Sequence, residues 1–294
     1  MFSVIYVLAV AASDQQSIGR GADPCELGAL PTQTSSSENG EHDFYDEIAP
    51  RRRAIEADLK TGVHERWEAV YYDGSPHLGF ARGWALSRKL GYVSTTRRCD
   101  MGKVEVAGDR IALVSEAPGK AWGLMPLEYV IVPWDQQVYL VEPSELIEFC
   151  NDVNSGRLRA HGPAGRYPLR VGDFGKKPIG LPRVPRKYDD YLLRQPITAK
   201  VLQTNGNKGD VAVLGQHRLW SGFSLTLNVG KKDGVRTGMR FYLDPQPADD
   251  FPDAYVISVN ATRSELLECS WQEDAKPQAK IGMRLTTLEP APRH

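Results

Sequence analysis

The sequence lacks several patterns that mark common classes of protein. No apolar run reaches the roughly 18–20 residues that a helix needs to cross a bilayer. The motifs G-x-S-x-G and H-E-x-x-H and the phosphate-binding P-loop do not occur, and the six histidines are scattered. We therefore expect no catalytic residue, no cofactor and no metal ligand of a standard kind. The formal net charge of -1 favours no particular class of partner.

Cysteine is sparse as well. The chain has 4 cysteines, and none forms the C-x-x-C pair typical of zinc or thioredoxin sites. An even number of cysteines in an exported protein allows disulfides. Cys99 and Cys150 fall in one predicted domain, so they are the first pair to consider. The alternative is four separate thiols, each a small core residue.

The N-terminus has the pattern of an export signal. Residues 1–12 are apolar and small, with Ala9-Val10-Ala11 as a candidate cleavage motif, although a charged start is missing. The alternative is a buried first strand. Residues 13–43 are polar and rich in turn formers, which predicts a disordered tether. Together these segments predict an extracytoplasmic protein, periplasmic or secreted, of bacterial type.

Residues 44–156 are predicted to form one domain. Apolar residues at helical spacing indicate a helix over residues 44–60, broken or kinked at Pro50, with Arg51-Arg52-Arg53 on its solvated face. From residue 67 to residue 140, short strands alternate with tight turns, which is typical of an antiparallel meander. Pro143 then begins a short helix that ends before Gly156.

Residues 157–195 form a basic connector rich in proline and glycine. Between residues 157 and 187, nine arginine and lysine residues face one acidic residue, Asp173. Arg183, Arg186 and Lys187 are candidates for contact with an anionic surface. The alternative is a connector that lies against acidic faces of both domains. Nucleic acid is not expected, because the segment lacks regularly interleaved aromatic residues for base stacking.

Residues 196–288 read as a small β-barrel of SH3-like type, made of many short strands without helices. The most regular part is residues 225–241, where alternating apolar residues flank a turn containing Gly230, Gly234 and Gly238. Its pattern of Gly, Asp-Gly-Val and Gly-Met resembles the small β-barrels of the bacterial rod-shape protein MreC and related envelope proteins. That resemblance implies a barrel type and carries no catalytic residue.

Residues 67–154 are similar to a lipocalin-like domain of uncharacterised bacterial exported proteins. The matching elements include Tyr71-Tyr72-Asp73-Gly74, residues 108–113 and residues 146–151. The resemblance implies an open half-barrel with a covering helix. Trp84, Tyr92 and Trp134 are candidates for the wall of a small apolar cavity, and the alternative is that they fill the core.

The fold class predicted by these patterns is mainly β, with a lipocalin-like antiparallel meander, one or two short helices and a C-terminal small barrel. The leading functional hypothesis is a non-enzymatic, envelope-associated binding or scaffolding protein. Its partner would be an envelope protein or an anionic surface. The alternatives are a lipocalin-like binder of a small apolar ligand and an enzyme with a non-standard site at the domain junction. The sequence leaves the oligomeric state open.

Overall fold

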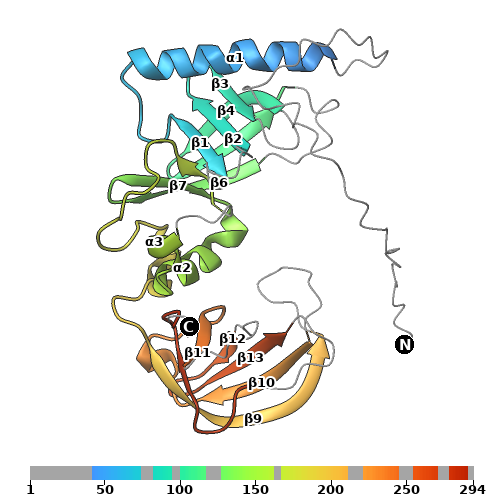
Figure 1. Ribbon diagram of the computed structural model, residues 1–294, viewed down its shortest axis with the longest axis vertical. Helices are drawn as coiled ribbons and strands as arrows, with labels where there is room; N and C mark the ends of the chain where they lie inside the picture. Colours follow the sequence, from blue (N-terminus) through green and yellow to red (C-terminus); the bar gives the residue numbers. More distant parts are fainter. Residues whose placement is uncertain are drawn as a thin grey trace, which may run out of the picture.

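Two closed antiparallel β-barrels follow one another along the chain. The computed structural model describes residues 42–73, 82–94, 100–116, 127–161, 167–210, 221–244, 254–270 and 278–290. Figure 1 shows helix α1 over one end of the first barrel and helices α2 and α3 between the two barrels. The mainly β fold with a small C-terminal barrel is thus confirmed. The predicted signal peptide, and the predicted tether up to residue 41, lie outside the described residues.

The first barrel has eight strands, each paired with the next. They are β1 (Val70–Asp73), β2 (Arg82–Ser87), β3 (Gly91–Ser94), β4 (Asp100–Ala107), β5 (Arg110–Ser115), β6 (Leu127–Trp134), β7 (Gln137–Val141) and β8 (Leu169–Arg170). Where the sequence predicted an open half-barrel, β8 closes the sheet by pairing with both β1 and β7. This closing strand has two residues and belongs to the predicted connector.

Helix α1 (His42–Thr61) covers the barrel through one apolar side. Ile48 and Ile55 are buried in a cluster with Ala85 and Val93 of β2 and β3. The helix continues through Pro50 without the break that was predicted. Of the helices in the described ranges, none is long and apolar enough to span a bilayer.

A short helical region links the barrels. It contains the 3-10 turn η2 (Pro143–Glu145), α2 (Leu146–Asn154), α3 (Arg157–His161) and a second 3-10 turn, η3 (Arg186–Tyr191). Phe149 of α2 packs edge-on against Tyr139 of the first barrel and Tyr167 before β8. The predicted short helix is thus α2, preceded by η2.

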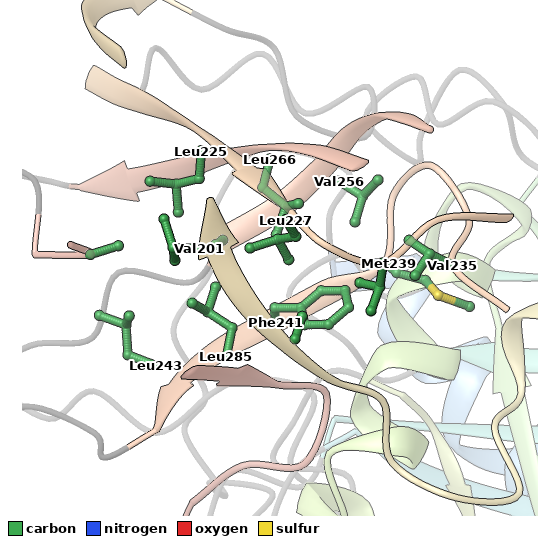
Figure 2. Packing of buried hydrophobic residues seen from close by; sticks show 14 residues of the cluster. Val201, Leu225, Leu227, Val235, Met239, Phe241, Leu243, Val256, Leu266 and Leu285 are labelled. Carbon is green, nitrogen blue, oxygen red and sulfur yellow. The ribbon is translucent and has the colours of Figure 1, made fainter. Parts of the chain in front are cut away.

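The second barrel has six strands in the order β10-β13-β12-β11-β14-β9. They are β9 (Thr198–Asp210), β10 (Ser221–Leu227), β11 (Arg240–Asp244), β12 (Ala254–Val259), β13 (Ser264–Ser270) and β14 (Arg284–Thr286). Alternate side chains of these strands point inward and make one core, drawn in Figure 2. The alternating apolar residues from which the barrel was predicted are therefore the residues that form its core.

The turn that gave the clearest sequence signal contains a 3-10 turn, η4 (Lys231–Asp233). Asp233 accepts a hydrogen bond from the backbone N–H of Gly230 at 2.8 Å. Gly234 then takes a left-handed conformation with φ of 87°, which a side chain would disfavour. Val235 and Met239 enter the core of the second barrel immediately afterwards (Figure 2).

Candidate functional site

The three aromatic residues predicted to line one cavity lie in two separate clusters. Trp84 and Tyr92 belong to the interior of the first barrel beside Tyr71, Leu86 and Ile111. Trp134 belongs to the cluster that packs under α2. All three side chains are buried. The structure therefore brings Trp84 and Tyr92 together and does not bring Trp134 to them.

Polar atoms are buried at the end of the barrel where Trp84 lies. The Tyr92 hydroxyl and the Ser115 hydroxyl both donate to the carboxylate of Asp100, at 2.5 Å and 2.8 Å. The indole N–H of Trp84 has no hydrogen-bond partner in the part of the chain that the structure describes. Burial and the neighbouring Asp100 raise the pKa of Tyr92 far above its ordinary value, so its hydroxyl remains a donor.

Cys150 is a free, buried thiol within α2. The disulfide predicted between Cys99 and Cys150 is therefore not formed in this structure, and Cys99 lies outside the described residues. Burial raises the pKa of the Cys150 thiol to about 12, and the nearby charge of Asp189 adds to the effect. The thiolate is the reactive form, so this side chain is chemically inert while the protein is folded.

We expect Cys150 to resist alkylation by iodoacetamide in the native full-length protein. It should react in guanidinium chloride without a reductant, because unfolding returns the thiol pKa to an ordinary value. Peptide mass spectrometry separates it from the other cysteines. Rapid labelling of native Cys150 would contradict its burial, and labelling that requires prior reduction would show that it is in a disulfide.

The junction between the barrels contains a buried ion cluster. Arg240, the first residue of β11, donates to Glu148 at 2.7 Å and to Asp152 through its second terminal nitrogen. Glu148 and Asp152 lie four residues apart on α2, so they share one face of that helix. All three side chains are buried. An arginine of the second barrel is thus held between two carboxylates of α2.

Neutral groups add further hydrogen bonds to the carboxylates of this cluster. Asn151 donates to Glu148 at 2.9 Å and to the backbone oxygen of Gly238 at 3.0 Å, and it accepts from the backbone N–H of Arg240. The hydroxyl of Tyr255 donates to Glu148, and that of Tyr167 donates to Asp152. The two carboxylates are therefore matched by donors from both barrels, which is the condition under which buried charges are tolerated.

Further contacts tie the linking segments to the same junction. Arg157 at the start of α3 makes two hydrogen bonds to Glu289 near the end of the described chain, at 2.9 Å and 3.1 Å. These bonds raise the pKa of Arg157 above its ordinary value, against the opposing effect of burial. Tyr191 donates to the backbone oxygen of Thr237, and Arg236 pairs with Asp190. Both sides of the interface are thus joined at several points.

The domain junction was predicted as the place of an alternative, non-standard enzyme site. The residues of the ion cluster were not predicted. Glu148 and Asp152 carry a weak signal, because two acidic residues at helical spacing usually mark a solvated face. Their position among the apolar residues Leu146, Phe149 and Val153 was the available clue. Each hydrogen bond given above for this cluster joins two groups of this chain, so the cluster connects parts of the protein.

The three basic residues predicted to meet an anionic surface, Arg183, Arg186 and Lys187, are all exposed. Other cations of the connector are used internally, since Arg157 pairs with Glu289 and Arg159 lies over the Trp134 ring at 5.3 Å. Arg157 and Arg159 thus contact other parts of the protein, whereas the side chains of Arg183, Arg186 and Lys187 are exposed. Contact of these three residues with an anionic surface stays a prediction.

Asp173, the one acidic residue between residues 157 and 187, is buried and accepts several hydrogen bonds. Its carboxylate accepts hydrogen bonds from Arg170, from Lys176 and from the backbone N–H of Val138 in β7. Burial alone would raise the pKa of this carboxyl, but the hydrogen bonds from Arg170 and Lys176 outweigh burial and lower it below its ordinary value. The charged form therefore secures the turn after β8 to the barrel.

We expect Asp173→Asn to destabilise the first barrel by about 2 kcal/mol at neutral pH, since hydrogen bonds to a charged group are lost. Because the folded pKa of Asp173 is lowered, its contribution is present above the unfolded pKa of about 4 and is lost as the pH falls through the folded value. The difference from wild type in urea midpoint should accordingly shrink on acidification. Asp109→Asn, in the exposed turn between β4 and β5, is the control; equal effects of both variants would refute this role.

Comparison with protein-family models, curated proteins and solved structures found no match to this chain. The resemblances to MreC-type barrels and to lipocalin-like domains accordingly stay predictions. Among the residues of the described ranges, no group of three or more histidine, cysteine, aspartate or glutamate side chains could hold a metal ion.

Proposed function

We propose that this chain is a non-enzymatic binding or scaffolding protein that presents two β-barrels in one fixed orientation, outside the cytoplasm and at a bacterial envelope. The observation that carries the proposal is the buried cluster of Arg240, Glu148 and Asp152. Its carboxylates bind an arginine of the same chain, so they act as a connection between barrels. The envelope location rests on the pattern of residues 1–12 and on the resemblance of the second barrel.

Fixed orientation has a physical basis in the charge arrangement. Separating the barrels would leave an arginine on one side and two carboxylates on the other, each without its partner. The cluster also specifies register, because Asn151 binds the backbone at both Gly238 and Arg240. A rotation of one barrel against the other would break these bonds together.

Backbone nitrogen-15 relaxation of the full-length protein tests the proposal. If the junction is rigid, amides of both barrels should report one common rotational diffusion tensor. Arg240→Met should release the barrels and shorten the apparent correlation time of each. Independent tumbling of the two barrels in the wild-type protein would refute a fixed scaffold.

A second candidate is a binder of a small ligand inside the first barrel, favoured by the buried indole N–H of Trp84 that lacks a partner in the described ranges. A ligand with a hydrogen-bond acceptor would satisfy that donor. Native mass spectrometry of protein purified without denaturation tests this alternative. A mass excess that disappears on denaturation and in Trp84→Phe would support it, and a bare polypeptide mass in wild type would count against it.

A further inference from the structure

The second half of the connector combines exposed cations with exposed apolar side chains. We call residues 176–187 the basic loop. Ile179 has 81% of its surface exposed and Leu181 has 39%. The exposed cations of this loop that contact no carboxylate in the described part of the chain are Lys177, Arg183, Arg186 and Lys187.

The basic loop is nevertheless held firmly against the first barrel. The indole N–H of Trp134 donates to the backbone oxygen of Gly180 at 3.0 Å, and Arg159 donates to the same oxygen. The backbone N–H of Arg183 donates to the oxygen of Pro133 at 2.9 Å. The barrel thus fixes the loop by its backbone.

Buried and exposed side chains alternate along the basic loop. Pro178, Pro182 and Val184 are buried, whereas Ile179, Leu181 and Arg183 between them are exposed. The prolines also restrict the backbone without needing a hydrogen-bond donor. The exposed side chains are therefore presented by an ordered backbone, which reduces the entropy that would be lost on binding.

Charge complementarity identifies the kind of surface that this loop fits. Cations near an anionic bilayer gain about 1 kcal/mol each, and an apolar side chain gains further by entering the boundary between headgroups and acyl chains. The attraction is local, because the whole chain has a net charge of -1. An acidic protein partner would match the cations but would not need the largely exposed apolar side chain of Ile179.

We propose that the basic loop docks the protein on the surface of an anionic lipid bilayer, with Ile179 at the acyl boundary and the cations at the lipid phosphates. This inference names the partner of the binding function proposed above and rests on it. If the protein does not bind lipid but both barrels still tumble as one body, the proposal of lipid binding is refuted and the proposal of a scaffold stands.

Sedimentation of the full-length protein with vesicles tests the proposal. Wild type should bind vesicles of phosphatidylcholine mixed with phosphatidylglycerol and should not bind phosphatidylcholine alone. The combined variant Arg183→Gln, Arg186→Gln, Lys187→Gln should bind roughly a hundredfold more weakly, from about 1 kcal/mol per cation. Ile179→Ser should bind about tenfold more weakly because apolar burial is lost.

Matched controls come from the second barrel. Ile281 has 68% of its surface exposed next to Lys280, so Ile281→Ser removes a similar apolar side chain elsewhere. The combined variant Lys231→Gln, Lys232→Gln, Lys280→Gln removes three exposed cations. Both controls should bind like wild type, and the melting temperature of every variant should be unchanged.

Three outcomes would overturn the proposal. Wild-type binding by both loop variants would show that the loop is not the contact. Equal losses in the controls would show attraction by general charge alone. If the protein instead binds polyglutamate in preference to vesicles, and Ile179→Ser does not weaken that binding, the partner is an acidic protein.

Discussion

Arg240→Met should lower the free energy of unfolding by about 3–5 kcal/mol, the range expected when one partner of a buried ion cluster is removed. Methionine fills much of the space of the arginine stem but cannot donate. Glu148 would then keep bonds from Asn151 and Tyr255, and Asp152 a bond from Tyr167, but both carboxylates would lose the positive charge of Arg240. The loss should weaken both barrels, because the cluster belongs to their common interface.

Arg284→Met is the matched control in the same barrel. Arg284 pairs with Asp244 at the surface and its side chain is 59% exposed, so its loss should cost less than about 1 kcal/mol. Urea unfolding gives the free energies, and hydrogen exchange read by mass spectrometry locates the weakened segments. Similar costs for Arg240→Met and Arg284→Met would mean that the buried cluster does not hold the barrels together.

Substitution of the carboxylates distinguishes a structural cluster from a catalytic one. Residues that serve catalysis are often unfavourable for stability, so that their replacement stabilises the fold. Glu148→Gln and Asp152→Asn should instead destabilise the protein, since each removes the charge that faces Arg240. A gain in stability from either variant would revive the hypothesis of an enzyme at the junction.

Local patterns predicted most of the strands because the period of two is visible in short stretches. The strand–turn–strand segment of residues 225–241 is the best example, since its core residues alternate in the sequence. Strand β8, with two residues, is too short to display a period, so the closure of the first barrel was not predictable. The predicted connector therefore contains a strand that belongs to the preceding domain.

The junction depends on pairs that are distant in the sequence. Glu148 and Arg240 are 92 positions apart, and neither residue alone indicates that the other is near. Arg51 was predicted to lie on a solvated helix face, because the groups that it contacts are also distant in the sequence. Its guanidinium group instead donates to the backbone oxygens of Leu90 and Gly102. Burial of a charge is set by the partner, which a local pattern does not contain.

Gly91→Ala should destabilise the first barrel by about 2–5 kcal/mol, from the sum of two effects. Gly91 has a positive φ of 80°, which costs about 1–2 kcal/mol for a residue with a Cβ. A Cβ there would also lie 2.0 Å from the backbone oxygen of Gly102 and 2.8 Å from the Arg51 guanidinium. Relief of that overlap costs about 1–3 kcal/mol more, because β3 and β4 must separate.

Gly108→Ala separates the two contributions. Gly108 also has a positive φ, of 64°, in the turn between β4 and β5, but a Cβ there would meet no atom within 4 Å. Its cost should therefore be the conformational part alone, about 1–2 kcal/mol. In Gly91→Ala, hydrogen exchange should also rise in the part of α1 around Arg51, because displacement of Arg51 breaks its bonds to Leu90 and Gly102. If the two alanine variants have equal stability and α1 keeps its protection, then Arg51 does not hold the helix on the barrel.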